Sequence, residues 1–182
     1  RHAMGEEDFF YPSDLQDARI EPRPYSFSRP WGVPVRYHDF QEYAARIQPD
    51  LWEFHLSYSD MELNPADYLV GPYQADLVVH APELFKGSRL MDLASPDDVY
   101  RNESIRDTQR VIDITRNLKH FFPNTHKPPI VANIGGFTMD APLPPSEIRD
   151  YYERFAQSLA LLDLDGVELI PQTMAPFPWH FG

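Results

Sequence analysis

The sequence predicts an α/β protein built on a parallel sheet, and three observations lead to this prediction. From residue 33 onward, segments with strand character alternate with segments of helical periodicity. Strands joined by helical crossovers pair in parallel. From Val33 the chain has 150 residues, whereas a complete (β/α)₈ barrel needs about 250 residues. We therefore expect an incomplete parallel (β/α) barrel with about five strands; an open doubly wound sheet is the alternative.

The first predicted elements are short. A strand is expected over residues 33–38, a helix over residues 40–47, and a second strand over residues 51–57. The second strand alternates between apolar and polar residues, which is typical of a strand with two unlike faces. The alternation separates two sets, with Trp52, Phe54 and Leu56 on one face and Glu53, His55 and Ser57 on the other.

A third strand and a long helix follow. The strand covers residues 76–80 and is ended by Ala81-Pro82. The segment Ser95-Pro96-Asp97-Asp98 has the features of a helix start, with a capping residue before proline and acidic residues in the first turn. This start predicts a helix from about Val99 to Phe122.

The last predicted elements are a strand, a helix and a strand. Residues 129–134 form the fourth strand, which Gly135-Gly136 ends, and residues 166–170 form the fifth. Between them, Ser146 is expected to cap a helix. Its apolar residues follow helical spacing closely: Ile148, Tyr152, Phe155, Leu159 and Leu162.

Composition excludes several classes of protein. The chain has 16 Lys and Arg against 28 Asp and Glu, a formal net charge of −12, which argues against a general nucleic-acid binder because phosphates select basic residues. It contains no cysteine, which excludes disulfides, thiolate metal sites and cysteine nucleophiles. No apolar run approaches the about 18 residues of a membrane span, and the N-terminus lacks the apolar core of a signal peptide. We expect a cytoplasmic protein with no membrane association.

Three regions are expected along the chain. Residues 1–20 have the character of the end of a small preceding module. Residues 21–31 are rich in proline, as in an extended and semi-rigid linker. Residues 32–182 contain all the predicted strands and form the barrel region.

Polar side chains follow the predicted strands where the active sites of parallel α/β proteins lie, at the carboxyl ends. Alternation along the strands directs one set toward the barrel interior: Arg36, His38, Glu53, His55, His80, Asn133, Glu168 and Gln172. Imidazoles and carboxylates can bind Zn²⁺ or Mn²⁺, and they can orient a sugar or phosphate. Alternatively, each strand-end histidine only forms hydrogen bonds within the protein and has no functional role. Glu168 is near the start of its strand, so it can instead lie at the opposite end of the sheet from the site. Gly135-Gly136 either offers backbone N–H groups to a phosphate or forms a tight turn.

One segment contains His80-Ala81-Pro82, then Asp92-Leu93-Ala94-Ser95-Pro96 at the opening of a predicted helix. With these residues it resembles the endonuclease IV / xylose isomerase-like barrel superfamily. The resemblance implies a xylose isomerase-like barrel with His80 as a metal ligand and a divalent cofactor, Zn²⁺ or Mn²⁺. Where the endonuclease branch has further ligands, this chain has Asn133-Ile134-Gly135 and Pro171-Gln172-Thr173.

A longer resemblance covers nearly the whole chain. Phe9-Phe10-Tyr11-Pro12-Ser13-Asp14-Leu15, the linker, residues 32–39 and residues 53–58 resemble the long forms of sialic acid (N-acetylneuraminate) synthase-like proteins. In that family a synthase barrel precedes a small SAF domain, and an isomerase-like barrel follows. The resemblance implies that residues 1–20 are the tail of a SAF domain, that the chain is a fragment, and that an upstream synthase domain belongs to the same protein.

Three functions are open at this point. The first is a sugar phosphate isomerase/epimerase-like barrel in nonulosonic (sialic-type) acid biosynthesis, with a carbohydrate or sugar phosphate as partner. The second is a non-catalytic sugar-binding or scaffold module, and the third is an endonuclease IV-like phosphodiesterase. In the first, the expected residues are Glu53, His55 and His80 for catalysis, Arg36, His38, Asn133 and Gln172 for substrate binding, and His80 for the metal.

Overall fold

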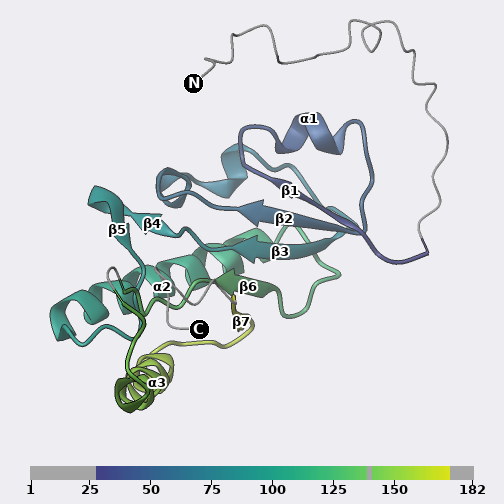
Figure 1. Cartoon of the computed structure of the whole chain (residues 1–182). Helices are drawn as coiled ribbons and strands as arrows, with labels where there is room; N and C mark the ends of the chain where they lie inside the picture. Colours follow the sequence, from purple (N-terminus) through teal and green to yellow (C-terminus); the bar gives the residue numbers. More distant parts are fainter. Residues whose placement is uncertain (1–27, 139–140, 173–182) are drawn as a thin grey trace, which may run out of the picture.

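The protein has a mixed α/β fold around a five-stranded parallel sheet. The computed structural model describes residues 28–138 and 141–172. The strands are ordered β1-β2-β3-β6-β7, so each strand of this sheet lies beside the one that follows it in sequence (Figure 1). Their bounds are β1 Gly32–Val35, β2 Leu51–His55, β3 Asp76–His80, β6 Pro129–Ala132 and β7 Glu168–Pro171. The five predicted strands and the parallel α/β class are confirmed.

Three α-helices accompany this sheet in the described part of the chain: α1 Phe40–Ala44, α2 Asp98–Lys119 and α3 Pro145–Ala160. Each overlaps a predicted helix. In Figure 1, α2 runs alongside β3 and β6, and α3 lies at the end of the molecule that carries β7. Short 3₁₀ turns cover Ser59–Glu62, Pro65–Asp67 and Lys86–Ser88.

A small hairpin was not predicted. The strands β4 (Leu84–Phe85) and β5 (Arg89–Leu90) pair antiparallel, and the turn between them contains Gly87 with a φ of 72°. Two-residue strands are too short to show any alternation, so the sequence carries no periodic signal for them.

The long helix α2 begins within one residue of its predicted start, but the capping residues of both longer helices differ from those predicted. The N-cap of α2 is Asp97, whose side chain accepts hydrogen bonds from the backbone N–H groups of Val99 and Tyr100 at 2.8 and 3.2 Å. The Ser95 hydroxyl instead accepts from the N–H of Asp97, the N-cap residue that precedes the helix. In α3, Pro145 occupies the first helical position, so Ser146 lies inside the first turn rather than at the cap.

An aromatic core lies between the sheet and the helices. Phe40 of α1 contacts the rings of Trp52, Phe54 and Phe122 with centroid distances of 5.3, 5.1 and 6.4 Å. Trp52 and Phe54 belong to the apolar set predicted for one face of β2, and both are buried. The alternation predicted for β2 is therefore confirmed, with its apolar face against the helices.

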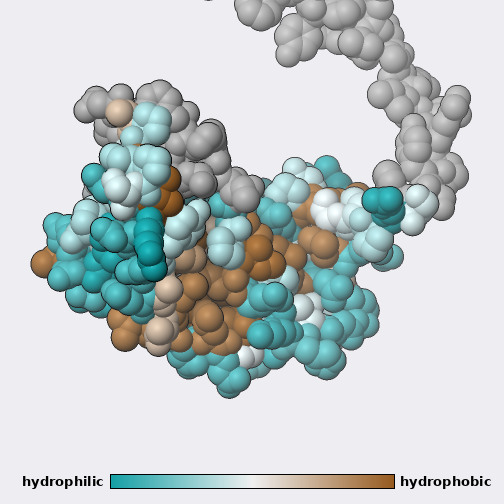
Figure 2. Space-filling model, turned by 60° about the horizontal axis from the view of Figure 1, so that its bottom comes forward, coloured by the Kyte–Doolittle hydropathy of each residue, from teal (hydrophilic) through white to brown (hydrophobic). Residues whose placement is uncertain are grey.

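The opposite face of the sheet is only partly covered. Along one row across the sheet, His55, His80, Val131 and Ile170 are register neighbours, and Ile170 is 39% exposed. Figure 2, which brings the β7 side of the molecule forward, shows apolar surface gathered in the middle and hydrophilic surface around it. Parallel sheets are normally covered on both faces, so this face is where a further layer or a ligand would lie.

The first strand begins at Gly32, the first residue of the predicted barrel region. The predicted SAF tail and most of the predicted linker lie outside the described residues, so these domain boundaries stay a prediction. Across residues 28–138 and 141–172, none of the helices has both the length and the apolar character needed to span a bilayer.

Candidate functional site

Two histidines meet at the carboxyl ends of β2 and β3. His55 and His80 are register partners in the parallel ladder, and both side chains point to the partly covered face. Their rings stack with centroids 4.2 Å apart and planes inclined by 9°. The pairing continues one step further, since the Leu56 N–H donates to the His80 carbonyl at 3.0 Å. The strand register thus holds the two imidazoles face to face.

His80 is held by polar groups at both ring nitrogens. Its Nδ1 lies 3.1 Å from the Ala81 carbonyl, and its Nε2 lies 3.0 Å from the Gln172 side-chain oxygen. Both partner atoms are oxygens that only accept, so each contact calls for an N–H on the ring. A neutral imidazole carries one N–H, so it donates either from Nδ1 to Ala81 or from Nε2 to Gln172. Gln172 is itself placed by the sheet, because its N–H donates to the Ala132 carbonyl at 2.8 Å.

His55 is the more accessible imidazole. Its Nδ1 lies 3.6 Å from Oε1 of Glu53, two residues earlier on the same face of β2. Burial lowers the pKa of His55 below its ordinary value, the neighbouring His80 and Arg36 lower it further, and Glu53 opposes this shift. His55 is therefore neutral at neutral pH and able to accept a proton, with the Glu53 carboxylate beside it to stabilise the charged ring.

A small cavity adjoins His55 on the β1 side. It has a volume of about 260 Å³ and is lined by Pro34, Val35, Arg36, Asp39 and His55. The Arg36 guanidinium forms an ion pair with Asp60 at 3.3 Å. This cavity gives His55 an open approach with a cation, Arg36, on one wall.

Asp60 is a polar residue of this region that the sequence analysis did not single out. Its side chain accepts from the N–H and the hydroxyl of Ser57 at 2.7 and 2.6 Å, and from Arg36. The Asp60 N–H in turn contacts the Ser57 hydroxyl at 3.4 Å. The Ser-x-x-Asp spacing of a reciprocal cap is the signal that identifies this pair in a sequence.

Of the predicted set, the structure brings Arg36, Glu53, His55, His80 and Gln172 to one region, and it leaves the other three apart. The His38 side chain is 70% exposed and its ring lies 3.9 Å from Asp39. The chain turns after β1, where the N–H groups of Asp39 and Phe40 both donate to the Arg36 carbonyl, so strand alternation does not extend to His38. Glu168 is the exposed first residue of β7, at the amino end of the sheet.

Asn133 is buried in a turn rather than directed at the histidines. Its side chain accepts from the Gly135 N–H at 3.2 Å, while the Gly136 N–H donates to buried Asp92 at 3.0 Å. Burial raises the pKa of Asp92, and the N–H groups of Ala94 and Gly136 oppose the shift. Both glycine N–H groups are therefore engaged within the protein. Of the two roles expected for Gly135-Gly136, the structure supports the tight turn and not the phosphate cradle.

The stacked histidines are not arranged to share one metal ion. Within the described residues, no group of three or more His, Asp or Glu side chains is placed to hold a metal. A metal lies close to the plane of an imidazole that binds it, and two parallel stacked rings share no such point. As they stand, His55 and His80 do not fit a shared ion. The Zn²⁺ or Mn²⁺ cofactor stays a prediction from the resemblance.

The shift of the His55 pKa gives a first testable prediction. In an NMR titration, His55 is expected to titrate below the ordinary histidine value of about 6.5. His80→Gln should raise the His55 pKa, because it removes a second ionisable ring from contact. Glu53→Gln should lower it, because it removes the carboxylate that favours the charged ring. Shifts of equal sign in the two variants would contradict this account of the site.

Comparison with known proteins assigns no family: no protein-family profile and no curated protein sequence matches this chain.

Proposed function

We propose that the polar group around His55 and His80 is a carbohydrate site, and that the sheet belongs to a xylose isomerase-like barrel of a protein of sialic-type acid biosynthesis. The proposal joins the sequence resemblance to the arrangement of the side chains. Its chemical part, sugar binding with proton transfer, rests on this chain's own residues. The upstream synthase domain and the SAF domain come from the resemblance alone.

The order of the strands supports a barrel over a doubly wound sheet. A doubly wound sheet reverses direction at a switch point, and its helices cover both faces. Here the order β1-β2-β3-β6-β7 proceeds in one direction across the sheet. Successive right-handed crossovers then place the helices on one side, which is the arrangement of a (β/α) barrel.

The observation that carries the function is the contact of Glu53, His55, His80 and Gln172 at the carboxyl ends of parallel strands. Hydroxyl groups of a sugar need neighbouring donors and acceptors, and this group supplies both. Isomerisation or epimerisation needs a base that takes a proton from the carbon beside a carbonyl and a group that returns it. Neutral His55 suits the first step, and Glu53 stabilises the imidazolium that results.

The charges of the site favour an uncharged sugar over its phosphate. Arg36 is already paired with Asp60, and Asp39 and Glu53 add further negative charge nearby. The amide groups of Gly135 and Gly136 are engaged by Asn133 and Asp92. A neutral or amino sugar therefore meets a more favourable field than a phosphorylated one.

A non-catalytic sugar-binding or scaffold module is the second candidate. Asn133 stands where the endonuclease branch has a metal ligand, and it serves to cap a turn. The endonuclease-like phosphodiesterase has less support, because the site is acidic and the chain carries a net charge of −12.

Binding and proton exchange separate these functions. In titration calorimetry, a neutral N-acetylated amino sugar or hexose is expected to bind more tightly than the matching 6-phosphate. His55→Gln should weaken binding by about tenfold, which corresponds to the loss of one hydrogen bond of about 1–1.5 kcal/mol. His120→Gln is the matched control, since His120 is exposed at the end of α2, and it should bind sugar as the native chain does.

Catalysis is tested by solvent deuterium entering the carbon beside the sugar carbonyl. Exchange that disappears in Glu53→Gln and His55→Gln would support the isomerase or epimerase chemistry. Sugar binding without exchange would favour the binding module. If no sugar binds at all, the carbohydrate proposal fails.

A further inference from the structure

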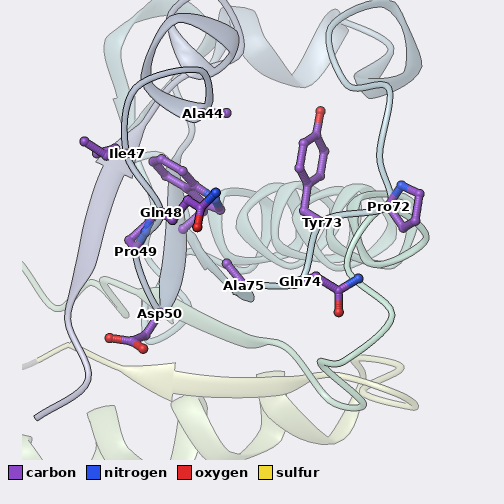
Figure 3. A pocket seen from close by; sticks show the side chains of 10 residues that line it. Ala44, Ile47, Gln48, Pro49, Asp50, Pro72, Tyr73, Gln74 and Ala75 are labelled. Carbon is purple, nitrogen blue, oxygen red and sulfur yellow. The ribbon is translucent and has the colours of Figure 1, made fainter.

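A second cavity lies at the amino ends of β2 and β3, at the opposite end of the sheet from the histidine pair. Its volume is about 500 Å³. Figure 3 shows Gln48, Pro49 and Asp50 on one side of it and Pro72, Tyr73 and Gln74 on the other. The end of α1, the start of β2 and the segment before β3 therefore form its walls, and we call it the amino-end groove.

The amino-end groove combines an apolar floor with a polar rim. Ala44, Ile47, Trp52 and Ala75 supply apolar surface, and all four belong to or pack against the main core. The side-chain amides of Gln48 and Gln74 and the Asp50 carboxylate stand on the rim. Such a groove suits an aromatic or proline-rich peptide, whose rings bury apolar area while its exposed backbone accepts and donates hydrogen bonds.

One wall of the groove is firmly held. The Tyr73 hydroxyl accepts from Gln41 at 3.0 Å and from the Val70 N–H at 3.2 Å. The Tyr73 ring packs edge-on against Phe40 with centroids 4.9 Å apart. A preformed wall lowers the entropy lost when a peptide binds.

The chain enters the sheet beside this groove. The Trp31 N–H donates to the Asp50 side chain at 2.8 Å, and the Trp31 carbonyl accepts from the Asp50 N–H at 3.0 Å. Asp50 is itself a rim residue. The segment immediately before residue 28 is therefore tethered within a few residues of the groove.

The composition of that segment matches the groove. Residues 20–27 read Ile-Glu-Pro-Arg-Pro-Tyr-Ser-Phe, with two prolines and two aromatic residues. Phe27 precedes Trp31 by four residues, and an extended chain spans about 3.3 Å per residue, so its side chain is within reach of the groove. A short tether raises the effective concentration of the segment to about the millimolar range, so even weak affinity produces occupancy.

We propose that the amino-end groove binds the chain's own residues 20–27, with Tyr25 and Phe27 on the apolar floor. This contact fixes the direction in which the preceding region of the protein leaves the sheet. It lies away from the candidate carbohydrate site and does not depend on the function proposed for that site.

A spin label tests this proposal in the full chain. Because the sequence contains no cysteine, Ser26→Cys provides a single labelling position. A nitroxide at this position is expected to remove most of the amide NMR intensity of Ala44, Gln48 and Ala75. A label at Ser13→Cys, outside the proposed segment, should leave those signals largely intact. Equal broadening by the two labels would overturn the proposal.

Two further measurements separate binding by the aromatic side chains from the effects of the tether and of a second copy. Tyr25→Ser and Phe27→Ser together, in the labelled chain, should restore most of the groove signals, whereas proximity through the tether alone would leave the broadening unchanged and contradict the proposal. Both residues precede β1, the first strand of the described sheet, whose fold the double variant should keep. In a mixture of isotope-labelled chains and spin-labelled chains, broadening of the groove signals would show that a second copy occupies the groove and would also overturn the proposal.

Discussion

Replacing Phe40 with alanine is expected to lower the free energy of unfolding by about 3–5 kcal/mol. Phe40 is fully buried, and its ring meets those of Trp52, Phe54, Tyr73 and Phe122. The substitution removes apolar area from the core, leaves a cavity, and abolishes several aromatic contacts at once. Urea denaturation followed by circular dichroism measures the loss.

Tyr43→Ala is the matched control on the same helix. Tyr43 is also aromatic, but it is 43% exposed. Its removal should cost much less than that of Phe40, since surface substitutions usually change stability by about 0.5 kcal/mol or less. Similar losses in the two variants would show that α1, rather than the aromatic core, governs the effect.

Gly135→Ala is expected to cause the other large loss of stability, together with a movement of the turn that contains Asn133 and Gly136. Gly135 has a φ of 94°, which an L-residue rarely adopts, and an added Cβ would overlap the Cα and a carboxylate oxygen of Asp92. The Asp92 backbone must then move, and its side chain is bound to the Gly136 N–H. Amide NMR shifts of Asn133 and its neighbours should report this movement, and denaturation should report the stability.

Gly166→Ala separates the backbone conformation from the clash. Gly166 has a φ of 72°, and no atom lies within 4 Å of the position of an added Cβ. Its replacement should lower the free energy of unfolding by only about 1–2 kcal/mol, which is the cost of placing an L-residue in the left-handed conformation. Gly135→Ala should cost about 1–3 kcal/mol more, which is the usual range for overpacking. If both variants lose the same stability, the contact with Asp92 is unimportant.

The strands were predictable because the signal for each is local. Residues 52–57 alternate between apolar and polar, and the apolar set is buried as predicted. Residues 76–80 are bounded by Ala81-Pro82, and β3 ends at His80. Backbone geometry fixes a two-residue period within a strand, so a few residues suffice to identify one.

Helix starts were less predictable because several nearby residues compete to cap the same turn. Ser95 and Asp97 both have suitable side chains, and only the path of the chain decides that Asp97 bonds the first turn of α2. In the same way, α3 begins at Pro145, so Ser146 lies inside the first turn and does not cap the helix.

The candidate site was predicted in part. Within strands, alternation placed Glu53, His55 and His80 correctly on one face. Beyond the strand ends it held for Arg36 and Gln172, each one residue past its strand. It failed for His38 and Asn133, because the turns after β1 and β6 direct the first to solvent and the second to Gly135.

The sequence by itself determined the α/β class, the five parallel strands and the polar face of β2. The strands and the polar face follow from periodicity within single segments, and the parallel pairing follows from the alternation of strands with helices along the chain. Only the tertiary structure decided that His55 stacks on His80, that Gln172 faces His80, and that Asp92 occupies the glycine turn. These contacts join residues far apart in the chain, and strand register and loop packing set them together. A local sequence pattern contains no information about which distant residues its side chains will contact, so the contacts within the site could not be predicted before the fold was known.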